Sequence, residues 1–80
     1  MSIISKKAAR VNSAMLKGTI VKAGFTQDEV ADKLGLSPTA FNNKVNNKSE
    51  FKASEIKRLT VILNLTRDEV DLIFFDYEVD

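Results

Sequence analysis

The chain has 80 residues, which allows one small domain with a single hydrophobic core. It contains no cysteine and no histidine, so disulfides, Cys–His or Ser–His catalysis and an ordinary zinc site are excluded. All twelve Lys and Arg lie within residues 1–67 beside five acids, whereas residues 68–80 carry six acids and no base. A basic body favours nucleic acid as a partner, although a solvated surface with an acidic end explains the charge equally well.

The first ten residues lack helical or strand periodicity, and we expect residues 1–10 to form a basic N-terminal arm. This stretch is too short and too polar for a secretory signal. The apolar runs of the chain also fall short of the ~18 residues that a membrane span needs. We therefore expect a cytoplasmic protein that has no membrane partner. The arm could reach a DNA groove through its bases, Lys6, Lys7 and Arg10.

Five short helices are predicted in the domain that follows, residues 11–75. The first four are expected at about residues 12–23, 27–34, 38–46 and 53–63, and the fifth opens after a capping box at Thr66. Phe51, between the third and fourth helices, is expected to fill the core. Residues 76–80 form an acidic tail, and the alternation of apolar and acidic residues near it suits an extended strand. The sequence shows no evident internal repeat.

The second and third predicted helices are joined by a very short turn. Thr26 and Glu29 have the spacing of a reciprocal capping box at the start of the second helix. Gly35 supplies the left-handed residue that commonly ends a helix. Ser37 then caps a third helix whose first residue is Pro38. This order predicts a helix-turn-helix, although a tight helical hairpin in any all-α protein would use the same residue types.

The third helix has one narrow apolar edge and is otherwise polar. At about 100° per residue, Phe41 and Val45 define the buried edge. Thr39 and Asn43 then fall on the opposite side, where a helix could present them to a partner. A solvated helix face is the plain alternative for both residues.

These helices resemble the phage repressor and Cro type of helix-turn-helix domain, the Cro/C1 or XRE family, over roughly residues 16–74. The resemblance is strongest from Thr26 to Gly35, with a small residue, Ala31, where the second and third helices cross. It implies a compact all-α bundle of about five helices, and a sequence-specific regulator of transcription that binds double-stranded DNA. The whole chain also resembles small phage-encoded regulators that end in an aromatic pair, which implies a phage or prophage repressor.

The resemblance implies that the third helix reads the major groove, with base contacts from Pro38, Thr39 and Asn43. Asn43 is the best candidate because its amide can bond adenine N6 and N7 together. Contacts to the DNA backbone should be more numerous than contacts to bases. From the helix starts and from the end of the third helix, we expect them at Gln27, Ser37, Asn42, Lys44, Asn47, Lys48 and Lys52.

A domain this small binds DNA specifically most readily as a homodimer on a two-fold symmetric operator. Phe75 and Tyr77 are expected to form the dimer contact, although the tail could instead fold onto its own core. The alternative function is a protein-interaction module of the same fold, such as an antirepressor or an antitoxin subunit with a regulatory protein partner. Catalysis, a metal site and a cofactor are not expected, because the carboxylates lack an opposed partner and the glycines are scattered.

Overall fold

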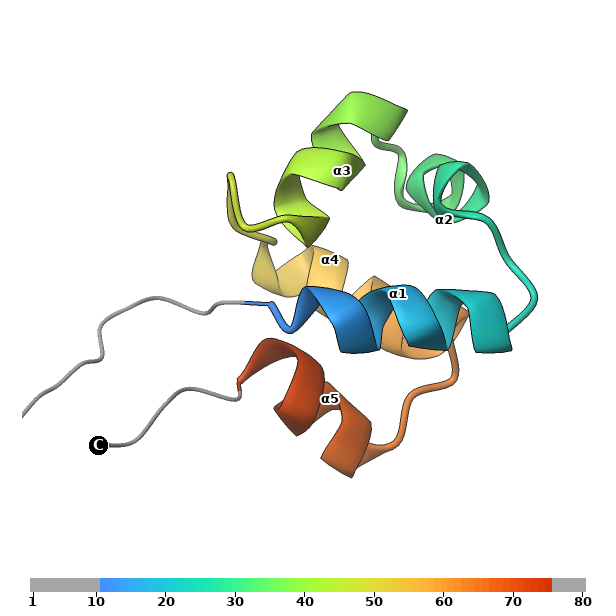
Figure 1. The fold of residues 1–80 in the computed structure, drawn as a ribbon, viewed down its shortest axis with the longest axis vertical. Coiled ribbons are helices and arrows are strands. Elements are labelled where there is room, and N and C mark those ends of the chain that lie inside the picture. Colours follow the sequence, from blue (N-terminus) through green and yellow to red (C-terminus); the bar gives the residue numbers. More distant parts are fainter. Residues whose placement is uncertain (1–10, 76–80) are drawn as a thin grey trace, which may run out of the picture.

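The computed structural model describes residues 11–75, and within that range the secondary structure is five α-helices without a strand (Figure 1). The helices are α1 (Ser13–Lys22), α2 (Gln27–Leu34), α3 (Pro38–Val45), α4 (Ala53–Ile62) and α5 (Arg67–Phe74). This confirms the predicted compact all-α fold, with helix ends within one residue of those expected. The N-terminal arm and the acidic tail, including the strand expected there, lie outside the described residues.

Each of the first four helices is followed, one or two positions after its last residue, by a residue with positive φ. These residues are Gly24, Gly35, Asn47 and Asn64, with φ of 85°, 76°, 64° and 52°. In each case the next residue donates its N–H to the carbonyl five positions back, which satisfies a carbonyl that the helix end leaves free. Glycine adopts this conformation without strain, and asparagine is among the few other residues that tolerate it. The four helix ends are therefore encoded locally.

The core is built from apolar residues at helical spacing in all five helices. Phe41 of α3 and Phe74 of α5 are its largest fully buried side chains. Phe51, in the loop before α4, links them through edge-to-face contacts, with ring centroids 5.9 Å from Phe41 and 5.8 Å from Phe74. Such pairs stabilise a core beyond the area that they bury. The expectation that Phe51 fills the core is confirmed.

No internal repeat is expected from the sequence, and the structure shows a partial similarity between two pairs of helices. The bounds of α4 and α5 equal those of α1 and α2 shifted by 40 residues. Six positions are also identical at this shift: Lys17 and Lys57, Val21 and Val61, Thr26 and Thr66, Asp28 and Asp68, Glu29 and Glu69, Val30 and Val70. The repetition is hard to detect in the sequence because few of the identical residues are apolar core positions.

The helices are arranged so that α3 and α5 lie on opposite sides of the domain, with α1 and α4 between them (Figure 1). Helix α2 packs against both α3 and α4, and α1 packs against α2, α3 and α5. A backbone hydrogen bond from Asn12 to the carbonyl of Ile73, 2.7 Å long, ties the start of α1 to α5. This arrangement leaves one side of α3 at the surface of the molecule.

Candidate nucleic-acid interface

The residues predicted to cap α2 and α3 and to form the turn between them make the expected contacts. Thr26 N–H donates to the Glu29 carboxylate at 2.8 Å, and the Glu29 N–H donates back to the Thr26 hydroxyl at 3.1 Å. The Ser37 hydroxyl accepts the N–H of Ala40 at 3.1 Å and so starts α3. Ala31 of α2 is completely buried, and α2 packs against α3. The local geometry of this unit follows the sequence closely.

Helix α3 buries one edge and exposes much of the remainder. Phe41 and Val45 have no exposed surface, whereas Pro38 and Thr39 are exposed. Asn43, expected at the centre of the exposed side, is less exposed than Pro38 and Thr39 and is half-buried. The chain turns back beside it after α3, and the N–H groups of Lys48 and Ser49 donate to the Asn43 carbonyl at 2.8 and 3.4 Å. These two bonds belong to the turn that ends α3.

The C-terminal half of the α3 surface is rich in amides. The Asn46 amide donates to both the side-chain oxygen of Asn42, at 3.1 Å, and the Asn42 carbonyl, at 3.0 Å. Both residues are exposed. The bond orients the Asn42 side chain along the helix, and an amide held in this way can contact a phosphate with less ordering of its side chain.

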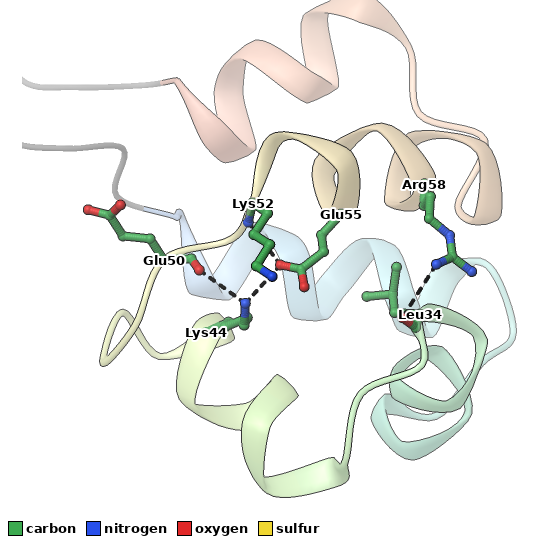
Figure 2. A network of polar contacts seen from close by, with 6 residues as sticks. All are labelled: Leu34, Lys44, Glu50, Lys52, Glu55 and Arg58. Atoms are coloured by element: carbon green, nitrogen blue, oxygen red, sulfur yellow. Dashed lines mark hydrogen bonds and ion pairs between the residues drawn. The ribbon is translucent and has the colours of Figure 1, made fainter.

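Lys44 was expected to meet the DNA backbone, and the structure places its charge elsewhere (Figure 2). The ammonium forms an ion pair with Glu55 of α4, with Nζ 2.8 Å from Oε1. It also donates to the Glu50 carbonyl at 3.2 Å and lies 6.0 Å from the centroid of the Phe51 ring. The Lys44 side chain is only 13% exposed. Its distant partners in sequence, rather than its position on α3, decide where it points.

Glu55 is the buried acid that receives this contact. Burial raises the pKa of its carboxyl, but the hydrogen bond from Lys44, the N–H of Lys52 and the charges of both lysines outweigh burial. The pKa is therefore lowered from its ordinary value of 4.5. The Lys52 N–H donates to Glu55 at 2.8 Å, so the same carboxylate also stabilises the start of α4. Glu55 thus joins α3, the loop and α4.

Asn47 was also expected to contact DNA, and its side chain is used within the protein. Its side-chain oxygen accepts the N–H of Val11 at 2.8 Å, and its amide donates to the Val11 carbonyl at 2.9 Å. The Ser13 hydroxyl donates to the carbonyl of Val45 close by. The segment before α1 is therefore fixed against the end of α3, which is where residues 1–10 join the domain.

The other residues expected at a DNA backbone lie at the surface or are half-buried. Lys48 and Lys52 are exposed in the loop after α3, Ser37 is exposed at the start of α3, and Gln27 is half-buried at the start of α2. Phe75, expected in the dimer contact, is 44% exposed after α5, and its neighbour Leu72 is 47% exposed. Tyr77 lies outside the described residues.

Sequence reasoning did not single out Glu55 and Arg58 of α4. Arg58 donates to the carbonyls of Lys33, at 2.8 Å, and Leu34, at 3.5 Å, and places its charge at the C-terminal end of α2, where the helix dipole favours a cation (Figure 2). A signal for Glu55 was available, because it precedes the buried Leu59 by four residues and so shares its inward face. Residues on one side of α4 therefore bind both α2 and α3.

The described residues 11–75 contain no group of three or more acidic side chains arranged to hold a metal ion. Within the same range, none of the helices is long and apolar enough to cross a membrane. A shallow groove lies between the end of α1 and the junction of α4 and α5, lined in part by Phe25, Ile62 and Asn64. Within residues 11–75, we therefore take the polar surface of α3 as the candidate functional site.

A search of curated proteins gives no match to the chain. A family profile does match it over residues 11–77, which includes all of the described residues 11–75. The chain belongs to the DUF739 family, described as a protein of unknown function.

Proposed function

We propose that this protein is a sequence-specific regulator of transcription, of the phage or prophage repressor type, that binds double-stranded DNA with α3 in the major groove. The observation that carries the proposal is the division of α3 into two sides. Phe41 and Val45 fix the helix to the core with no exposed surface, while Pro38, Thr39 and an amide-rich strip remain outside. Hydroxyls and amides are groups that read base edges in the major groove.

The surroundings of α3 support contacts to phosphates. The start of α3, with exposed Ser37, and the loop lysines Lys48 and Lys52 lie at its two ends. Helix starts and lysines both favour phosphate, and such contacts set the position of a reading helix on DNA. The buried Ala31 permits the close packing of α2 that this placement needs.

The proposal is tested by footprinting on the DNA that flanks the gene of this protein, followed by binding to the protected site and to random duplex. Asn43→Ala should lose about 1–3 kcal/mol on the preferred site and little on random DNA. Lys48→Ala should instead weaken both duplexes similarly and flatten the salt dependence by roughly one unit. Arg67→Ala on α5, away from α3, is the matched control for the lost charge and should change neither. A protein without any preferred duplex would refute the proposal.

A second candidate is a protein-interaction module with weak or no DNA readout, such as an antirepressor or antitoxin subunit. The charge of the domain favours it, because residues 11–75 carry nine bases against eight acids. Asp28, Glu29 and Asp32 of α2 are exposed close to the unit that would face DNA. Stable pairing with a second protein, together with duplex binding that does not respond to salt, would identify this function.

Specific binding by so small a domain also leads us to propose a homodimer on a two-fold operator. Leu72 of α5 and Phe75 directly after it offer exposed apolar surface. Helix α5 lies on the side of the domain opposite α3 (Figure 1). Deleting residues 75–80 should give a folded monomer that binds a half-site weakly. Ultracentrifugation at tens of micromolar, with circular dichroism on the same samples, tests this; a monomeric parent or a dimeric truncated form would contradict it.

A further inference from the structure

Lys44 is the one basic residue of α3, and three groups of the protein surround its ammonium. They are the Glu55 carboxylate at 2.8 Å, the Glu50 carbonyl at 3.2 Å and the Phe51 ring at 6.0 Å. With 13% of its side chain exposed, Lys44 is turned toward α4 and away from solvent. The charge of α3 is therefore neutralised inside the domain.

This neutralisation leaves the outer side of α3 polar but uncharged. The exposed residues of the helix are Pro38, Thr39 and Asn42, with Asn46 directly after it. Attraction between cations and phosphates raises affinity for every duplex, whatever its sequence, whereas contacts to base edges discriminate between duplexes. A free lysine at position 44 would add to the first kind of binding only.

We propose that Glu55 is a specificity-determining residue, because it withdraws the Lys44 charge from DNA and so lowers affinity for arbitrary duplex. Glu55 acts through Lys44 and makes no DNA contact itself. The inference rests on the proposed DNA-binding function. The proposal also gives a reason for the burial of Glu55, which is only 8% exposed in a domain with few buried polar residues.

Glu50, in the loop between α3 and α4, provides a matched control. Its backbone carbonyl accepts from Lys44, but its carboxylate points away from that ammonium (Figure 2). Glu50 is exposed, whereas Glu55 is buried. Glu50→Gln and Glu55→Gln therefore remove the same charge close to α3, and only the second releases Lys44.

The experiment measures binding of the parent and both variants to the footprinted site and to random duplex of equal length, over a series of salt concentrations. Glu55→Gln should bind random duplex up to about tenfold more tightly near 0.1 M salt, with a log–log slope steeper by about 0.9, the value of one phosphate contact. Its ratio of specific to random affinity should fall. Glu50→Gln should keep the parent slope, and equal slopes in the two variants would overturn the proposal.

A second measurement, made without DNA, separates failure of this inference from failure of the proposed function. The rate at which Lys44 is acetylated, mapped by mass spectrometry, should be low in the parent and in Glu50→Gln and high in Glu55→Gln. A parent that protects Lys44 but prefers no duplex would refute the DNA-binding function, and the specificity role with it. A parent whose Lys44 reacts as fast as Lys48 would overturn the inference alone.

If Glu55→Gln fails to fold, the double variant K44M/E55M gives the decisive slope. It replaces the ion pair by two apolar side chains of similar size, which folded domains commonly accept, at the cost of the Lys52 N–H bond to Glu55. The parent slope should be retained, because Lys44 contributes no free charge in the parent. A slope flatter by about one unit would show that Lys44 contacts a phosphate, and would overturn the proposal.

Discussion

Two pairs of consecutive helices, α1 with α2 and α4 with α5, have equal helix lengths and closely similar junctions. The two pairs nevertheless make different contacts with the rest of the domain. Each junction has a left-handed residue, Gly24 or Asn64, then an apolar residue, then a threonine that caps the next helix. The capping boxes at Thr26 and Thr66 agree to within 0.1 Å in both hydrogen bonds. Similar local sequence thus produces the same local structure twice.

The differences between the hairpins lie on the faces that meet other helices. Ala31 of α2 is completely buried, whereas the matching residue of α5, Asp71, is exposed. Glu55 of α4, which holds Lys44, corresponds to Met15 of α1, which packs against the core. The comparison teaches that capping residues build a hairpin, while a few outward-reaching side chains decide what it contacts.

The largest effect is expected when Glu55 is changed to the residue of the matching position in α1. Glu55→Met removes both the partner of Lys44 and the acceptor of the Lys52 N–H, and should cost about 2–3 kcal/mol of stability even though the freed Lys44 can turn to solvent. K44M/E55M loses the Lys52 bond without freeing a charge and should cost only about 1 kcal/mol. Denaturant unfolding at pH 7 measures both. An equal loss in the two variants would assign the cost to packing and not to the ion pair.

The same variants give a dependence on pH. The folded-state pKa of Glu55 is lowered, so its stabilising contribution is complete above the ordinary value of 4.5 and is lost as the pH falls through the lower folded value. The stability of K44M/E55M should consequently fall less than that of the parent on acidification from pH 5 to pH 3. Parallel curves would contradict this assignment.

Introducing a larger apolar side chain at matching positions should affect stability differently in α2 and in α5. Ala31→Leu forces extra volume into a completely buried position of α2 and should cost roughly 1–3 kcal/mol. Asp71→Leu, at the matching exposed position, should change stability by no more than about 0.5 kcal/mol. Thermal melting of the two variants compares them directly, and a normal melting temperature for Ala31→Leu would show that the helix register is wrong.

The left-handed positions should respond in opposite directions. Gly24→Ala should cost about 1–2 kcal/mol, and the cost is conformational because an added Cβ would meet no other atom within 4 Å. Asn64→Gly relieves the smaller strain of the second junction and should be neutral or stabilising by a few tenths of a kcal/mol. Chemical denaturation measures both, and a destabilised Asn64→Gly would show that the Asn64 side chain makes a contact of its own.

The smallest expected effects are those of the two capping threonines. Thr26→Ala and Thr66→Ala each remove one hydroxyl acceptor and should each cost about 1 kcal/mol, with equal values because the bonds are the same. Unequal losses in parallel melts would mean that the surrounding helices, and not the box itself, hold one of the junctions.

The sequence by itself determined the five helices, their ends and the unit of α2 and α3. These features depend on contacts between residues three to five positions apart, such as Thr26 with Glu29, so a short stretch of sequence specifies them. The buried edge of α3 was predictable for the same reason. Even the missed similarity of the two hairpins was available in the sequence, at a shift of 40 residues.

Only the tertiary structure decided which polar side chains of the α3 region face outward. Lys44 and Asn47 looked like surface residues, but Glu55 is eleven residues from Lys44, and Val11 is 36 residues from Asn47. Helical geometry specifies on which side of a helix a residue begins, and a long side chain can then bend toward a partner that packing brings near. The charge that α3 presents to a partner is therefore set by α4 and by the loop before it, and cannot be read from α3 alone.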